Sequence, residues 1–157
     1  MERMKSVQDS LTEQVHVVIP SHINSAERLF GGRLLEWIDE VAGIVGKRHS
    51  EHMAVTACID NLQFKEGAFL DDIVVLRGKV TYVSNSSMEV RVDTYVEDRQ
   101  GMRKPINRAY FVMVALDSEG KPVRVPRLKV ETESEKAEWE GGVLRHQLRK
   151  ERRKAGY

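Results

Sequence analysis

The chain has 157 residues, 41% of them hydrophobic, so it can bury the core of one ordinary domain and is too short for two. Its 25 Lys and Arg residues nearly balance its 24 Asp and Glu residues. This balance excludes a strong long-range attraction of the whole molecule to nucleic acid or to an anionic membrane. The single cysteine, Cys58, excludes an internal disulfide and a thiolate cluster for zinc, and free cysteine is usually a small buried residue.

The chain shows no sign of a membrane span or a leader segment. Residues 1–6 are charged and polar and are not followed by an apolar run. No window approaches the length of uninterrupted apolar sequence that a spanning helix needs. We therefore expect a soluble, cytoplasmic protein with no membrane span and no nucleic-acid partner.

A long helix is predicted over residues 31–49, where apolar residues recur with helical spacing. They cover about half of the circumference or more, so the helix should be packed on several sides, as a central helix would be. Asp39 lies on one flank of this apolar arc. Its neighbours there are Gly32, Gly43 and Gly46, glycines that suit a close approach by a ligand or another backbone.

Five segments have strand character: 15–19, 53–64, 72–83, 87–97 and 106–116. The fourth alternates cleanly between apolar and polar residues, and the fifth is apolar on both faces, which predicts a central strand. The connections over 65–71, 84–86 and 98–103 are short and carry turn residues, which favours antiparallel hairpins between successive strands. The expected fold class is α+β, with one strand, one long helix and then an antiparallel meander.

Beyond Pro126 the chain becomes polar and helix-prone, over about 134–154, with a predicted interruption at Gly141 and Gly142. Its end, 149–154, is strongly basic and could be either a solvated tail or a clamp for ligand phosphates. We expect the chain to be organised in three parts. They are an N-terminal extension over 1–9, a domain over 10–130 and a helical basic tail over 131–157.

Asn24, Gly31, Gly32 and Asp39 place an amide, a glycine pair at a helix start and a carboxylate within sixteen residues. Backbone N–H groups at a helix start favour negative charge, so the glycines are the expected donors to an oxyanion. Asp39 is the expected catalytic carboxylate, as a base on water or as a nucleophile. Asn24 can position the carbonyl or the water, and Thr56 can orient the carboxylate or the water through its hydroxyl.

Each of these residues also has a structural interpretation. Asn24 could close a turn, the glycine pair could only permit a tight entry to the helix, and Asp39 could hydrogen-bond a loop. Thr56 could be an ordinary strand residue. His49 and His52 form an isolated pair at a helix end without a third ligand, so we expect a capping or surface role and no metal site.

Taken together, these motifs resemble the hotdog-fold acyl-CoA thioesterases, specifically the cytosolic acyl-CoA hydrolase group. The resemblance covers about residues 10–130 and begins with Asn24 seven residues before the glycine pair. It continues through five short segments: Phe-Gly-Gly-Arg-Leu-Leu at 30–35, Trp-Ile-Asp-Glu at 37–40, Val-Thr-Ala-Cys-Ile-Asp at 55–60, Ser-Ser-Met-Glu-Val at 86–90 and Ala-Tyr-Phe-Val-Met-Val-Ala-Leu-Asp at 109–117.

The resemblance implies an antiparallel sheet wrapped around one long central helix, and hydrolysis of fatty acyl-CoA to a free fatty acid and CoA with no added cofactor. It implies that two copies pair, with Asn24 of one facing Asp39 of the other, and that dimers assemble into hexamers. It also implies contacts to CoA from Ala57, Cys58, Ile59, Ser86, Ser87, Met88 and Arg145. Of these, Arg145 is expected to reach the phosphates.

The chain departs from the family pattern at Glu27, where the family commonly has glycine. Glutamate resists the positive φ that glycine accepts easily, and it adds a negative charge near the site. Two alternatives to hydrolysis stay open. One is a non-catalytic acyl-CoA sensor that controls a partner or DNA through its basic tail, and the other is a hydratase or dehydratase using a histidine such as His22. The retained Asn24 and Asp39 favour the hydrolase.

Overall fold

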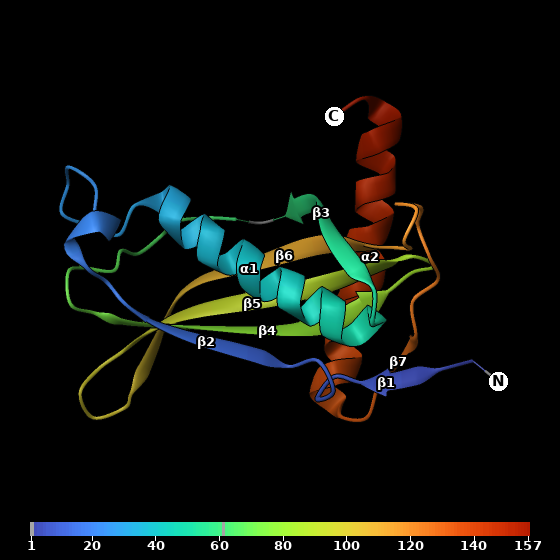
Figure 1. Ribbon diagram of the computed structural model, residues 1–157, viewed down its shortest axis with the longest axis horizontal. Helices are drawn as coiled ribbons and strands as arrows, with labels where there is room; N and C mark the ends of the chain where they lie inside the picture. The colour runs from blue at the N-terminus through green and yellow to red at the C-terminus, as the bar shows by residue number, and fades with distance from the viewer. Residues whose placement is uncertain (1, 61) are drawn as a thin grey trace.

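One antiparallel sheet forms the body of the molecule, and a long helix lies across it (Figure 1). The computed structural model describes residues 2–60 and 62–157. Met1 lies outside the described residues, as does Asn61, which falls within the strand expected over 53–64. Within the described residues, no helix has the length and apolar character that crossing a bilayer requires.

The sheet has five strands, whose bounds lie close to those predicted. They are β2 (Thr12–Val17), β3 (Met53–Asp60), β4 (Ile73–Val83), β5 (Ser87–Glu97) and β6 (Arg103–Leu116). The helices are α1 (Gly31–Ser50) and α2 (Glu133–Ala155), with a 3₁₀ turn at Pro20–His22. A small parallel sheet pairs β1 (Met4–Ser6) with β7 (Arg127–Lys129), so part of the expected N-terminal extension is a strand.

The strand order is β2-β4-β5-β6-β3, which confirms two of the three predicted hairpins. The β4–β5 and β5–β6 pairs are antiparallel neighbours joined at 84–86 and 98–102. The hairpin predicted at 65–71 is wrong, because β3 pairs with β6 and not with β4. The chain instead crosses from β3, an edge strand, to β4, which lies next to the opposite edge strand β2.

α1 supplies the centre of the core, as its wide apolar arc predicts. Four of its side chains are completely buried: Ile38, Val41, Ala42 and Val45. Burying an aliphatic side chain of this size stabilises the fold by about 1.5–3 kcal/mol. The sheet approaches the helix closely at Gly78, where an added Cβ would lie 2.7 Å from Cγ1 of Val41. The expected α+β class, with a sheet wrapped around one long helix, is confirmed.

The flank of α1 that carries Asp39 faces β3. At Gly46 an added Cβ would lie 2.9 Å from the Cβ of Ala54, so this glycine lets α1 and β3 pack closely. Gly43 has no atom within 4 Å of the position a Cβ would take. Of these two glycines, only Gly46 allows a strand to approach the helix, and it sets the distance between α1 and β3.

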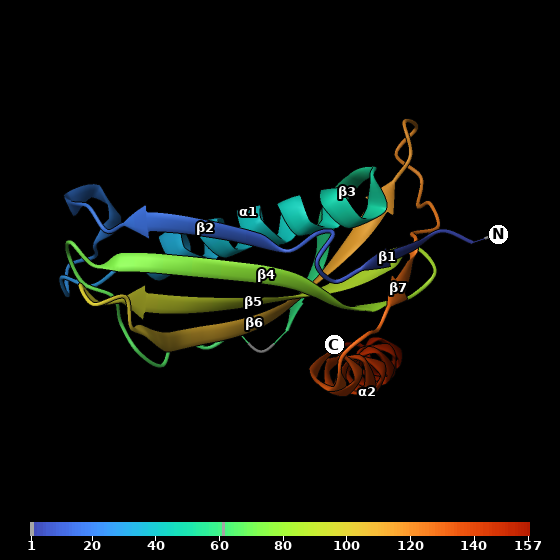
Figure 2. The same cartoon turned by 90° about the horizontal axis from the view of Figure 1, so that it is seen from below.

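α2 crosses the opposite face of the sheet from α1 (Figure 2). The predicted interruption at Gly141 and Gly142 is wrong, since the helix is continuous through both. A Cβ at Gly142 would lie 2.5 Å from the Cβ of Tyr82, so the glycine is where the helix meets the sheet. Trp139 packs on the same tyrosine, with ring centroids 4.6 Å apart. The basic segment is thus the end of a docked helix.

A buried carboxylate anchors α2. The side chain of Glu89 in β5 is completely buried and accepts hydrogen bonds from Arg145 at 2.8 and 3.0 Å and from Arg149 at 3.0 Å. Thr81 donates a further hydrogen bond to it at 2.6 Å. Burial alone would raise the pKa of Glu89, but these hydrogen bonds and the arginine charges hold it below the ordinary value of 4.5.

Replacing this carboxylate should loosen α2. We expect Glu89→Gln to lower the free energy of unfolding at pH 7 by about 3 kcal/mol, because it leaves buried arginine charge uncompensated. A carboxylate whose folded pKa is depressed contributes stability that is complete above pH 4.5 and is lost as the pH falls through the folded pKa. The variant should therefore lose less stability than the wild type in acid.

The test is urea unfolding followed at pH 7 and at pH 3.5, with Glu140→Gln as the control because Glu140 is an exposed carboxylate of α2. The control should match the wild type at both pH values. An anchoring role for Glu89 would be contradicted by a Glu89→Gln variant that is as stable as the wild type at pH 7.

Candidate functional site

Asp39 and Thr56 form a hydrogen-bonded pair between α1 and β3. The Thr56 hydroxyl donates to Oδ1 of Asp39 at 2.5 Å, and its oxygen lies 3.5 Å from the sulfur of Met113. Both members of the pair are exposed in the single chain. The hydroxyl fixes the orientation of the carboxylate, whose Oδ2 accepts no hydrogen bond from the described residues. An exposed, oriented carboxylate with a free oxygen can act on water or on an electrophile.

A register shift in β3 follows directly after Thr56. Thr56 lies opposite Met113, while Cys58 lies opposite Val112, so Ala57 is an extra residue in the ladder. Such a bulge reverses which face the following side chains point to. Thr56 accordingly contacts α1 on one face of the sheet, and Asp60 contacts α2 on the other.

Asn24 closes a short loop before α1. Its Oδ1 accepts hydrogen bonds from the backbone N–H groups of Ala26 at 2.9 Å and Arg28 at 3.2 Å, so the turn interpretation holds for the oxygen. These two donors also fix which end of the amide is oxygen. Its Nδ2 donates to no acceptor among the described residues. The loop therefore presents an oriented N–H donor for a ligand.

Glu27 occupies a backbone position that suits glycine. Its φ is 61°, which lies in the left-handed region. Glutamate resists this region, whereas the glycine that the family commonly has at this position accepts it easily. The cost is about 1–2 kcal/mol. Two backbone hydrogen bonds hold the loop in this shape. The N–H of Glu27 donates to the carbonyl of Asn24 at 3.0 Å, and the N–H of Asn24 donates to the carbonyl of Arg28 at 2.8 Å.

The start of α1 leaves backbone donors free. No side chain caps the helix at Phe30, whose carbonyl accepts from Arg33 and Leu34. The N–H groups of Gly31 and Gly32 meet no acceptor in the part of the chain that the structure describes. They point out of the positive end of the helix and can bind an oxyanion.

Two aromatic rings flank these donors. An added Cβ at Gly32 would lie 2.5 Å from the ring of Phe30, so a side chain there would displace this exposed ring. The ring of Phe64 lies 3.6 Å from the Cβ position of Gly31. Both rings are more than half exposed, at 56% and 53%. The free N–H groups thus open into an apolar surrounding that suits a hydrocarbon group.

Five of the seven residues expected to contact CoA line one cavity. Its volume is about 560 Å³, and it lies between β3, the turn after β4 and the C-terminal half of α2. The five residues are Ala57, Cys58, Ile59, Ser86 and Ser87. Cys58 is only half-buried there, so its expected burial is wrong. Met88 points into the core, is fully buried and does not line the cavity.

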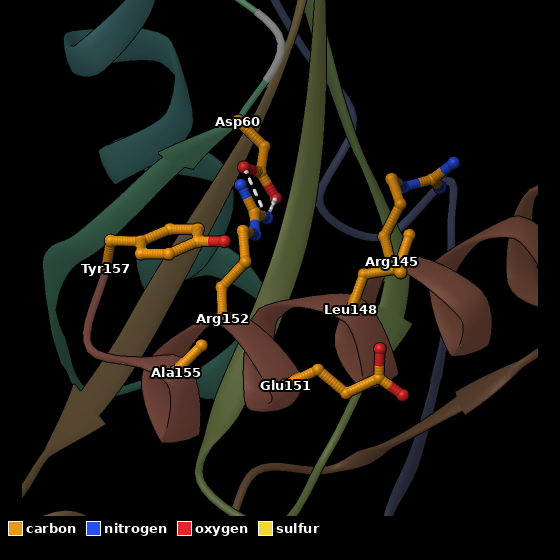
Figure 3. Close-up of a pocket in the computed structure, with 7 residues that line it drawn as sticks. All are labelled: Asp60, Arg145, Leu148, Glu151, Arg152, Ala155 and Tyr157. Atoms are coloured by element: carbon orange, nitrogen blue, oxygen red, sulfur yellow. Dashed lines mark hydrogen bonds and ion pairs between the residues drawn. The ribbon is translucent and has the colours of Figure 1, made fainter.

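Arg145, expected to reach the phosphates, is bound elsewhere. Glu89 holds its guanidinium, which also lies 3.8 Å from the ring centroid of Tyr110. It lines a neighbouring pocket with Asp60 and Arg152, where its side chain points away from both (Figure 3). Arg145 is therefore part of the contact between α2 and the sheet.

The arginines that do line the cavity come later in α2. Arg149 bridges Asp60 at 2.9 Å and Glu89 at 3.0 Å. Arg152 donates to Asp60 at 2.9 Å (Figure 3). Burial alone would raise the pKa of Asp60, but the two arginines hold it below its ordinary range. Arg153 also lines the cavity and has no carboxylate within 4.0 Å among the described residues.

Sequence reasoning missed the roles of Asp60, Glu89 and Arg153. A signal was present, because arginines at 145, 149 and 152 recur on one face of a helix. Such a row is expected to face carboxylates when the helix is docked. Nothing local to Glu89 marked it as buried, since it alternates with apolar residues as an exposed side chain would.

The histidines do not form a catalytic or metal cluster. His49 is fully buried, so the expected capping or surface role is wrong, and its Nε2 lies 2.8 Å from the carbonyl of Pro126. Burial lowers its pKa. His22 uses Nδ1 to accept from the N–H of Ile19. Across residues 2–60 and 62–157, no three His, Cys, Asp or Glu side chains are arranged to hold a metal ion.

Sequence comparison places the chain among known proteins. The family described as Thioesterase superfamily matches residues 27–102. The chain is 40% identical over 138 residues to an uncharacterised acyl-CoA thioester hydrolase of Bacillus subtilis, covering 87% of this chain and 80% of that protein. It is 36% identical over 152 residues to the rat cytosolic acyl coenzyme A thioester hydrolase. That match covers 94% of this chain but only 40% of the rat protein.

Comparison with solved structures also finds acyl-CoA thioesterases and hydrolases. An apo-hexameric acyl-CoA thioesterase superposes with a TM-score of 0.91 at 36% identity, covering 96% of this chain and 97% of that one. An acyl-CoA hydrolase of Staphylococcus aureus, solved with butyryl coenzyme A, coenzyme A and coenzyme A disulfide, gives a TM-score of 0.90 at 34% identity. Here the shared part is 96% of this chain and 92% of that one.

Proposed function

The chain belongs to the thioesterase superfamily, and on that premise we propose that it hydrolyses fatty acyl-CoA to a free fatty acid and CoA. The observation that carries the proposal is the exposed Asp39–Thr56 pair, which adjoins the cavity lined by Ala57 and Cys58. Ala57 directly follows Thr56 in β3, so the strand that orients the carboxylate also lines a cavity of a size that suits the pantetheine arm. The relatives named as cytosolic support a cytoplasmic role in fatty acid metabolism.

The Staphylococcus aureus enzyme supports the choice of residues. Structures of its alanine variants replace an asparagine, an aspartate and a threonine. Those three positions are separated by 15 and 17 residues, as are Asn24, Asp39 and Thr56 in this chain. The same three residue types at the same spacing favour the same roles here.

The length of α1 argues that two copies share each site. Gly31 and Asp39 are eight residues apart in one helix, which separates them by about 12 Å along its axis. An oxyanion donor must lie about 3 Å from the carbonyl oxygen, and a base must reach a water that attacks the same carbonyl. One thioester cannot meet both groups of one chain. The donors of one copy therefore work with Asp39 of another.

The edge of the sheet offers the surface for this pairing. β3 has an unpaired edge, and Met53, Val55 and Ile59 are 63%, 42% and 39% exposed along it. A long exposed apolar edge strand is a liability that pairing with a second copy removes. We take the homodimer as the minimal unit. The apo-hexameric relative supports assembly of three dimers.

The reaction then needs only water. The thioester oxygen accepts from the N–H groups of Gly31 and Gly32, and the Asn24 amide helps to hold the carbonyl or the water. Asp39 of the second copy, oriented by Thr56, takes a proton from water while the water oxygen attacks the carbonyl carbon. Collapse of the oxyanion breaks the C–S bond, and the CoA thiolate leaves and takes up the proton. A direct attack by Asp39, giving an anhydride that water hydrolyses, uses the same geometry.

CoA binding follows from the cavity. The pantetheine arm lies along Ala57–Ile59, and Ser86 and Ser87 offer hydroxyl donors to it. Arg153 is the cation available to the phosphates, because Arg149 and Arg152 are already paired with carboxylates.

The alternatives to hydrolysis lose support. The sensor would use its basic tail on a partner or DNA, but that segment is a helix docked on the sheet, and two of its arginines are paired with Asp60. The hydratase would use His22, whose Nδ1 already accepts from the backbone. Neither alternative has an observation of its own in its favour.

Removing the carboxylate should abolish turnover. We expect Asp39→Ala to reduce hydrolysis of butyryl-CoA and palmitoyl-CoA, followed by thiol release, by about 100-fold or more. Binding of CoA, measured by calorimetry, should not change. Glu40→Ala is the matched control, since its carboxylate is the next residue of the same helix and is also exposed. Unchanged turnover in Asp39→Ala would sink the proposal.

The phosphate contact gives a separate prediction. Arg153→Ala should raise KM for butyryl-CoA by about fivefold and leave kcat unchanged, because a partly exposed charge contact contributes about 1 kcal/mol. Butyryl-pantetheine lacks the nucleotide phosphates, so its KM should not respond. Lys154→Ala, which removes the neighbouring charge outside the cavity, is the control. An equal rise in KM for both substrates would rule out a phosphate contact.

A further inference from the structure

A second polar cavity lies where the N-terminal end of α2 meets the sheet. Its volume is about 270 Å³, and it is distinct from the cavity assigned to CoA. β4, β5, the first turn of α2 and the segment after β1 all contribute to its lining. Its charged side chains are Arg77, Lys79, Arg91, Asp93 and Glu135, and the hydroxyls of Tyr95, Thr132 and Ser134 also line it.

Like charges face each other in this cavity. In the β4–β5 register Lys79 lies directly opposite Arg91, and Arg77 is the next side chain on the same face of β4. Like charges directly opposite each other destabilise a strand pair. Lys79 is half-buried, and burial together with the charge of Arg91 lowers its pKa. Lys79 therefore occupies a position where the sheet disfavours a positive charge.

The neighbouring carboxylates are already engaged. Asp93 accepts from Arg91 at 2.8 Å and from Arg108 at 2.8 Å, and Glu138 accepts from Arg91 at 2.5 Å. Within residues 2–60 and 62–157, neither Lys79 nor Arg77 has a carboxylate within 4.0 Å. Two cations at one cavity thus make no direct ion pair, although Asp93 lies opposite Arg77 in the β4–β5 register and Glu135 also lines the cavity.

We propose that this cavity binds a small anion of the phosphate class, either inorganic phosphate or the phosphate group of a small metabolite. Lys79 supplies a point charge, and Arg77 supplies the planar fork that matches a phosphate. The hydroxyls of Tyr95 and Ser134 can complete the contacts. The volume is below that of a typical pocket for a larger ligand, which favours a compact anion over a whole nucleotide.

The site is separate from the proposed chemistry. Asp39 and Thr56 lie between α1 and β3, whereas this cavity is lined by β4, β5 and the start of α2 and shares no lining residue with the cavity assigned to CoA. An anion bound there joins β4, β5 and the start of α2, and so acts on the docking of α2. The inference does not rest on thioester hydrolysis, and its test uses no acyl-CoA.

The test compares melting temperatures of the full-length wild type in sodium chloride, sodium phosphate and glycerol phosphate at equal ionic strength. We expect phosphate at 100 times its Kd to raise the melting temperature by about 5 °C over chloride. A similar rise with glycerol phosphate identifies a site open to metabolites, and a rise with inorganic phosphate alone identifies a closed one. If neither anion exceeds chloride, the proposal is overturned.

Lys79→Met separates this site from the CoA cavity. It removes the charge opposed to Arg91, so it should melt above the wild type in chloride and show no further rise with phosphate. Lys129→Met, an exposed lysine of β7, and Arg153→Ala should both keep the wild-type response. The proposal fails if Lys79→Met keeps the response, or if Arg153→Ala alone loses it, since the anion would then bind in the CoA cavity.

Discussion

The register shift in β3 is the constraint on which the rest of the structure depends. One extra residue, Ala57, lets a single edge strand serve both faces of the sheet. Before the shift, Thr56 points to α1 and orients Asp39. After it, Asp60 points to α2 and pairs with Arg149 and Arg152. Without the shift, Thr56 and Asp60 would point to the same face of the sheet. Either Asp39 would then lose Thr56, or the arginines of α2 would lose Asp60.

The same strand also explains why one chain is incomplete. Because β3 lies at the edge of the sheet, the groups it orients are exposed, and the residues that follow Thr56 line the cavity proposed for CoA. The donors at Gly31 and Gly32 lie about 12 Å away along α1, beyond the reach of one thioester. A second copy paired at this edge brings the missing half of each site. Fold, assembly and chemistry are thus connected through one strand.

Local signals gave much of this architecture from sequence. β5 coincides with its predicted bounds because its alternation is unbroken, and α1 starts at Gly31 as predicted because its apolar spacing is long and regular. The pairing of β3 with β6 was missed because strand pairing is a non-local property, and the register shift leaves no mark in the residue types. The docking of α2 was missed because its contact point, Gly142, reads locally as a helix breaker.

Complementation between two inactive variants tests the shared site most directly. Asn24→Ala and Asp39→Ala chains would be unfolded together in equal amounts, refolded, and assayed for butyryl-CoA hydrolysis beside each variant refolded alone. If the amide and the carboxylate meet across the interface, half of the dimers are mixed and one of their two sites is intact. The mixture should then recover about a quarter of wild-type activity. A mixture no more active than either variant alone would contradict the account.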